Sequence, residues 1–160
     1  MIKKRIEQLI KKFNQYDIDG YIVPKNDEFF SEYAVTDRLK TISNFSGSAG
    51  LAVISRKINY LFVDGRYTLQ AKIQSGKIFK IFTLPNKLPS DVLKNKKFSI
   101  GYDPKLHTEL MIEKFFEKTR CKLMPISENL INKIWLRKNN SNLKYRQTRN
   151  YVLHNYLFYS

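Results

Sequence analysis

TDRLKTISNFSGSAGLAVISRKINYLFVDGRYTLQA, which runs from Thr36 to Ala71, is the stretch that decides the fold. Two apolar runs inside it, Leu51–Ile54 and Tyr60–Val63, are each bounded by residues typical of turns, which is the pattern of buried strands. The residues between the runs, 55–59, predict a turn. The stretch is therefore expected to form an antiparallel hairpin.

The loop that leads into this hairpin, residues 45–50, reads Phe-Ser-Gly-Ser-Ala-Gly. Small residues let backbone approach backbone, and glycine can take positive φ, so a tight loop is expected at Gly47 and Gly50. A phosphate-binding loop is excluded, because such loops lead from a strand into a helix and carry Lys followed by Ser or Thr. Ser48 does not lie in a nucleophile elbow, since Gly-x-Ser-x-Gly is absent.

Four polar residues of the stretch are candidate site residues: Arg38, Ser48, Asp64 and Arg66. Asp64 precedes a helix expected over Arg66–Ser75, so its carboxylate is suited to cap that helix, and Gly76 is expected to end it. Arg66 fits two roles. It either forms a salt bridge within the domain or presents its guanidinium at the strand ends, where ligands collect in α/β sheets.

The N-terminal region predicts a helix, a strand and a loop. Apolar residues at helical spacing indicate an amphipathic helix that ends near Asn14, and a short strand follows at 21–23. The segment 25–33 is expected to be a loop. It either carries functional side chains or packs its aromatic residues over the core.

The remaining elements continue this alternation. They are expected as helix 37–44, strand 79–84, helical turn 89–93, strand 98–102, helix 108–118 with Met111, Ile112, Phe115 and Phe116 on one face, strand 122–125 and helix 130–135. Strands alternating with helices, with one hairpin inserted, indicate an α/β domain of three layers, a mixed β-sheet flanked by helices.

Charge is the most pronounced feature of the composition. The formal net charge is +15, from 29 Lys and Arg against 14 Asp and Glu. Clustered basic residues would favour a nucleic-acid partner, but these are spread along every segment, which favours a solvated basic surface. No apolar run approaches the roughly 20 residues that cross a bilayer, and the N-terminus lacks a secretory signal, so a cytoplasmic protein is expected. The single cysteine, Cys121, allows no internal disulfide.

Several motifs, in the right order and at matching separations, resemble the N-terminal domain of Xaa-Pro aminopeptidases, the creatinase N-terminal family. These motifs are DGYIVP at 19–24, DEFFSEY at 27–33, Arg38, FSGSAG at 45–50 and FVDGRYTLQA at 62–71. The resemblance covers residues 1–137, including NLINKIW at 129–135, and implies the fold of that domain. Residues 138–160 form a divergent basic tail.

The resemblance implies a noncatalytic role. Family enzymes, also called aminopeptidase P, are metallopeptidases that remove the residue before an N-terminal proline. Their dinuclear site, usually manganese, lies in a C-terminal domain that this sequence lacks. We therefore expect no catalytic, cofactor or metal residues here and no peptide cleavage by the chain alone. His107 and His154 are expected to be ordinary surface or partly packed residues.

In the family this domain shapes substrate access and contributes to subunit contacts. A homodimer or a separate aminopeptidase catalytic chain is therefore an expected partner. Arg38, Ser48, Asp64 and Arg66 are the candidate interdomain or substrate-access contacts.

Two questions about the chain stay open at this point. From Asn139 onward the tail is either a short basic amphipathic helix or the unselected end of a shortened reading frame. Our hypothesis is a naturally truncated domain from a split or decaying gene. The alternative function is a stand-alone basic module that binds nucleic acid or another polyanion, with nucleic acid the less favoured partner.

Overall fold

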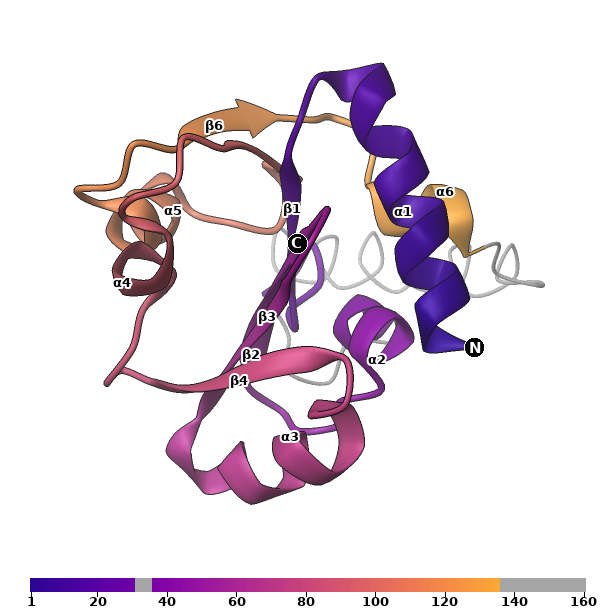
Figure 1. Cartoon of the computed structure of the whole chain (residues 1–160), viewed down its shortest axis with the longest axis vertical. Coiled ribbons are helices and arrows are strands. Elements are labelled where there is room, and N and C mark those ends of the chain that lie inside the picture. The colour runs from indigo at the N-terminus through magenta and orange to yellow at the C-terminus, as the bar shows by residue number, and fades with distance from the viewer. Residues whose placement is uncertain (31–35, 136–160) are drawn as a thin grey trace, which may run out of the picture.

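The computed structural model describes residues 1–30 and 36–135. The six described strands form one mixed sheet in the order β4-β3-β2-β1-β5-β6, between two layers of helices (Figure 1). The strands are β1 Gly20–Pro24, β2 Gly50–Ser55, β3 Asn59–Asp64, β4 Phe79–Leu84, β5 Ser99–Tyr102 and β6 Lys122–Pro125. The helices are α1 Ile2–Tyr16, α2 Arg38–Ser43, the 3-10 turn η1 Gly65–Tyr67, α3 Thr68–Ser75, α4 Pro89–Leu93, α5 Glu109–Phe116 and α6 Leu130–Ile134.

Each face of the sheet has its own apolar core. One core joins the sheet to α1, α2, α3 and α6 through residues such as Phe13, Ile42 and Ile131. The other core packs α4 and α5 against the opposite face through Leu93 and Ile112. The predicted three-layer α/β architecture is therefore confirmed.

Among the described strands, β2 alone runs opposite to the other five. The hairpin β2–β3 is antiparallel with Leu51 opposite Phe62, as predicted, and β1 pairs antiparallel with β2. On the far side β1, β5 and β6 all run parallel, so their carboxyl ends meet at one edge. In α/β sheets the residues that follow such strand ends are the usual position for ligand or partner contacts.

Local signals set most helix ends, although several ends differ from those predicted. Helix α1 continues to Tyr16, two residues past the expected end, and Asp17 then turns the chain with φ 52°. The first turn of the helix expected at Arg66 is the 3-10 turn η1, and Gly76 ends α3 with φ −63° rather than in a left-handed conformation. Helix α5 is shorter than predicted, and Met111 is exposed.

Of the two reasons given for a tight loop, positive φ does not apply, since no glycine among the described residues has it. The other reason, the close approach of neighbouring atoms, is confirmed. A Cβ on Gly47 would lie 2.8 Å from Phe45 Cε2 and 3.0 Å from Tyr67 Cγ, and one on Gly50 would lie 2.9 Å from a backbone oxygen of Phe62. Close approach therefore requires glycine at both positions. Gly65 is different, because a Cβ there would meet its nearest neighbour at an ordinary 3.5 Å.

Candidate functional site

Arg38 lies inside the domain. It begins α2 and is only 2% exposed. Its Nε donates to Asn132 Oδ1 of α6 at 3.0 Å, and its Nη2 pairs with Glu28 Oε1 at 2.5 Å. The guanidinium thus joins α2, α6 and the loop after β1.

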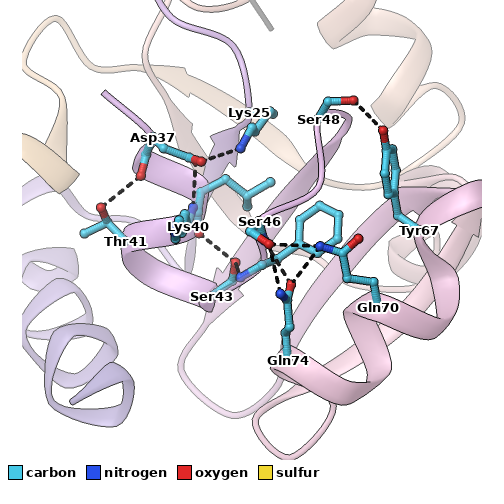
Figure 2. Close-up of polar contacts among 12 residues, drawn as sticks. Lys25, Asp37, Lys40, Thr41, Ser43, Ser46, Ser48, Tyr67, Gln70 and Gln74 are labelled. Atoms are coloured by element: carbon cyan, nitrogen blue, oxygen red, sulfur yellow. Dashed lines mark hydrogen bonds and ion pairs between the residues drawn. The ribbon is translucent and has the colours of Figure 1, made fainter. Parts of the chain in front are cut away.

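The other three predicted residues gather at the surface around Tyr67. Ser48 Oγ and Tyr67 Oη share a hydrogen bond of 2.7 Å (Figure 2), and the Arg66 guanidinium carbon lies 5.4 Å from the centre of the Tyr67 ring. Asp64 Oδ1 accepts from both the backbone N–H and the Nε of Arg66, at 3.0 and 2.9 Å. We call these four residues, Ser48, Asp64, Arg66 and Tyr67, the Arg66 cluster.

The Arg66 cluster combines two predicted roles. The carboxylate of Asp64 caps η1, as the sequence indicates. Hydrogen bonding from the Arg66 side chain and backbone lowers the pKa of that carboxyl. The Arg66 side chain forms a salt bridge within the domain and is nevertheless 73% exposed.

A second set of polar contacts holds the loop before β2 against α3. Ser46 Oγ accepts from the side-chain amides of Gln70 and Gln74, each at 2.9 Å, and the Ser46 N–H donates to Gln74 Oε1 at 3.0 Å (Figure 2). Sequence analysis did not identify these partners or Tyr67. The sequence signal for these contacts is the spacing of Gln70 and Gln74, four residues apart on one face of a helix, together with a serine-rich loop.

An open hollow of about 360 Å³ lies at the carboxyl ends of β1, β5 and β6. It is lined by Glu28, Asp103, Lys105, Ser127, Glu128, Asn129, Asn132 and Lys133. Its carboxylates have partners: Glu28 pairs with Arg38, Asp103 accepts from Asn129 at 3.0 Å, and Glu128 pairs with Lys133, which lowers the pKa of Glu128. Within residues 1–30 and 36–135, no three His, Cys, Asp or Glu side chains gather as a metal site.

His107 is more buried than its predicted surface or partly packed position. It is 7% exposed and contacts the Tyr102 ring edge-on at 5.9 Å between centroids. Neither ring nitrogen has a hydrogen-bond partner among residues 1–30 and 36–135. Burial lowers its pKa from 6.5 to about 4, although the charge of Asp103 acts in the opposite direction. His107 is therefore neutral in the folded domain at pH 7.

Comparison with known proteins agrees with this architecture. The family model described as the Creatinase/Prolidase N-terminal domain matches residues 5–134. The chain belongs to this family. Aminopeptidase P1 of Lotus japonicus is 35% identical over 74% of this chain, and Xaa-Pro aminopeptidase ApepP of Drosophila melanogaster is 34% identical over 74%.

Solved structures show the same fold. The X-prolyl aminopeptidase of Caenorhabditis elegans, a cytosolic enzyme with a di-nuclear active site, aligns with a TM-score of 0.74 at 24% identity, over 88% of this chain and 26% of its own. The N-terminal domain of the peptidase PepQ from Mycobacterium tuberculosis aligns with a TM-score of 0.66 at 16% identity, over 82% of this chain and 98% of its own.

This creatinase N-terminal domain spans about a fifth of the curated relatives that it matches, namely 19% of the Lotus protein and 21% of the Drosophila protein. Among its described residues, no helix has the length and apolarity to cross a bilayer. The predicted tail at 138–160 and Tyr33 lie outside the described residues.

Proposed function

We propose that the chain serves as the noncatalytic N-terminal domain of an Xaa-Pro aminopeptidase, in a truncated form, and contributes to substrate access and subunit contacts. The observation that carries this proposal is the family match over 5–134 in a chain that spans about a fifth of its relatives. A domain without its own reaction centre acts through contacts, so the surface residues matter most.

The Arg66 cluster is the proposed contact. Arg66 is held by Asp64 and lies over Tyr67, so its exposed guanidinium is fixed in direction before a partner arrives. Such preorganisation reduces the entropy lost on binding. Ser48 positions Tyr67, and Arg38 supports the interface from inside the domain by holding α6 and the loop after β1.

The proposed partner is an aminopeptidase catalytic part, on a separate chain or in a homodimeric assembly. The manganese pair and the peptide substrate would then belong to that part. Cytoplasmic location is proposed as well, and the description of the C. elegans relative as cytosolic supports it.

The test is a peptidase assay on an Xaa-Pro peptide with added manganese. The purified chain alone is expected to match a blank that contains only the metal. Adding the chain to a catalytic part prepared from the Drosophila relative is expected to change the turnover of that part, and Arg66→Ala is expected to weaken the change. Turnover by the chain alone well above the blank would contradict the noncatalytic assignment.

A further inference from the structure

The loop after β1, residues 25–30, presents two phenylalanines to solvent. Phe29 is 78% exposed and Phe30 is 48% exposed. Of the two alternatives for this loop, packing over the core is therefore wrong for these two rings. Adjacent exposed aromatic side chains are unusual on a protein surface that has no partner, and aromatic residues are enriched in the centres of protein interfaces.

The loop residues before the two phenylalanines are held by hydrogen bonds and ion pairs. The Lys25 ammonium pairs with Asp37, and the backbone N–H of Lys25 donates to Gly50 O at 3.0 Å. Asn26 Nδ2 donates to Leu106 O at 2.7 Å, and Glu28 pairs with the buried Arg38. The loop is thus joined to α2, to β2 and to the segment after β5.

A turn at Asp27 then directs the rings outward. Asp27 Oδ1 accepts from the N–H of Phe29 at 2.9 Å, and Asp27 O accepts from the N–H of Phe30 at 3.0 Å. Phe30 has φ 56°, a left-handed conformation that large side chains rarely adopt. An unfavourable backbone conformation held by several bonds is a feature typical of functional sites.

The same loop borders the hollow at the carboxyl ends of the parallel strands. Glu28 lines this hollow, and so do Asn132 and Lys133 of α6. In a chain that spans about a fifth of its relatives, α6 ends the part that the N-terminal family model matches. The polypeptide that follows this domain in the relatives therefore starts at the rim of the hollow.

We infer that Phe29 and Phe30 are the central contact with the catalytic part of an aminopeptidase, and that the polar hollow beside them forms the rim of that interface. The inference rests on the proposed function and adds an apolar contact to the one proposed at the Arg66 cluster. The partner must offer an apolar recess for two rings and polar groups that meet Lys105 and Lys133. This arrangement, an aromatic centre with a polar rim, is how protein interfaces concentrate binding energy.

A second exposed apolar pair supplies the matched control. Leu69 is 72% exposed and Ile73 is 76% exposed, and both lie on α3. Helix α3 packs on β3 and β4, whereas α6 packs on α1 and α2. The two pairs are similar in exposure. The phenylalanines lie on the loop whose Glu28 lines the hollow, whereas no residue of α3 lines it.

The experiment measures binding of the full chain to the Drosophila ApepP polypeptide from which the matched N-terminal segment has been removed. Three forms of the chain are compared: the unchanged chain, Phe29→Ser with Phe30→Ser, and Leu69→Ser with Ile73→Ser. The phenylalanine variant is expected to bind about thirtyfold more weakly or worse, since this corresponds to the loss of one interface hot spot. The α3 variant is expected to bind within about twofold of the unchanged chain, and unchanged melting temperatures would show that both variants fold.

Each other outcome has a separate meaning. Binding that is lost only in the α3 variant would overturn the inference and leave the proposed function standing. A phenylalanine variant that loses self-association in sedimentation but keeps its affinity for the ApepP polypeptide would assign the rings to a second copy of the chain, and would also overturn the inference. No binding by any form would contradict the proposed function itself.

Discussion

Acidification is expected to destabilise the folded domain through His107. This imidazole is 7% exposed, and neither of its nitrogens has a hydrogen-bond partner in the described part of the chain. A proton added there would place a charge out of contact with water, and this burial outweighs the opposing charge of Asp103 and lowers the pKa to about 4. The unfolded chain has no such restriction and takes up its proton near pH 6.5.

The sign and size of the effect follow from this difference in pKa. Above about pH 6.5 the imidazole is neutral in both states and contributes nothing to the pH dependence. As the pH falls from about 6.5 to about 4, the unfolded state binds a proton that the folded state does not, so stability decreases. The loss is about 2 kcal/mol at pH 5 and approaches about 3 kcal/mol at pH 4 and below, because one pKa unit corresponds to about 1.4 kcal/mol.

The measurement is urea denaturation of the chain and of His107→Phe, each at about pH 7.5 and about pH 5. Phenylalanine keeps a ring against Tyr102 and cannot take up a proton. The loss of unfolding free energy between the two pH values is expected to be about 2 kcal/mol smaller in the variant. Because His154 and the carboxyl groups are common to both proteins, their titration cancels in the comparison. Equal pH dependence in the two proteins would show that His107 is protonated in the folded state and would refute the reasoning.

Three further predictions concern packing, the arginines and charge. Gly47→Ala is expected to cost about 1–3 kcal/mol of unfolding free energy, because its Cβ would overlap the Phe45 ring. Gly65→Ala should change the unfolding free energy by less than about 0.5 kcal/mol. Equal effects of the two substitutions in thermal melts would contradict the contact argument. Arg38→Ala is expected to cost roughly 2–5 kcal/mol, as for other large buried side chains, and Arg66→Ala less than about 0.5 kcal/mol because its ion pair is exposed; a large melting loss for Arg66→Ala would assign that residue to stability. Oligonucleotide binding is expected to vanish by about 0.2 M salt, and tight binding at that concentration, measured by fluorescence anisotropy, would instead favour the polyanion-binding module.

The sequence allowed the hairpin and its following helix cap to be predicted, because their signals are local. Two apolar runs with a turn between them specify β2 and β3. An Asp directly after the second run caps the next helical turn, and this depends only on neighbouring residues. The alternation of the later elements was visible for the same reason.

The surroundings of the arginines could not be predicted, because their partners come from distant parts of the chain. Asn132 is 94 residues from Arg38, and only the packing of α6 on α1 and α2 brings them together. Tyr67 meets Ser48 because the loop before β2 folds back toward η1, which no local pattern encodes. The need for glycine at residue 47 was correctly expected, but its reason, the neighbouring Phe45 ring, depends on the same folding back.

The late position of α6 in the sequence has a consequence for synthesis of the protein. Three of the bonds that close the polar interior reach this region: Leu130 N–H donates to the Tyr21 hydroxyl, Asn129 donates to Asp103, and Asn132 accepts from Arg38. A ribosome makes Arg38 long before it makes that acceptor, so a nascent chain must carry the cation without it until α6 emerges. A chain halted before residue 129 should therefore be recognised by chaperones and proteases as incompletely folded, and we expect the domain to complete its fold only after its last helix has been made.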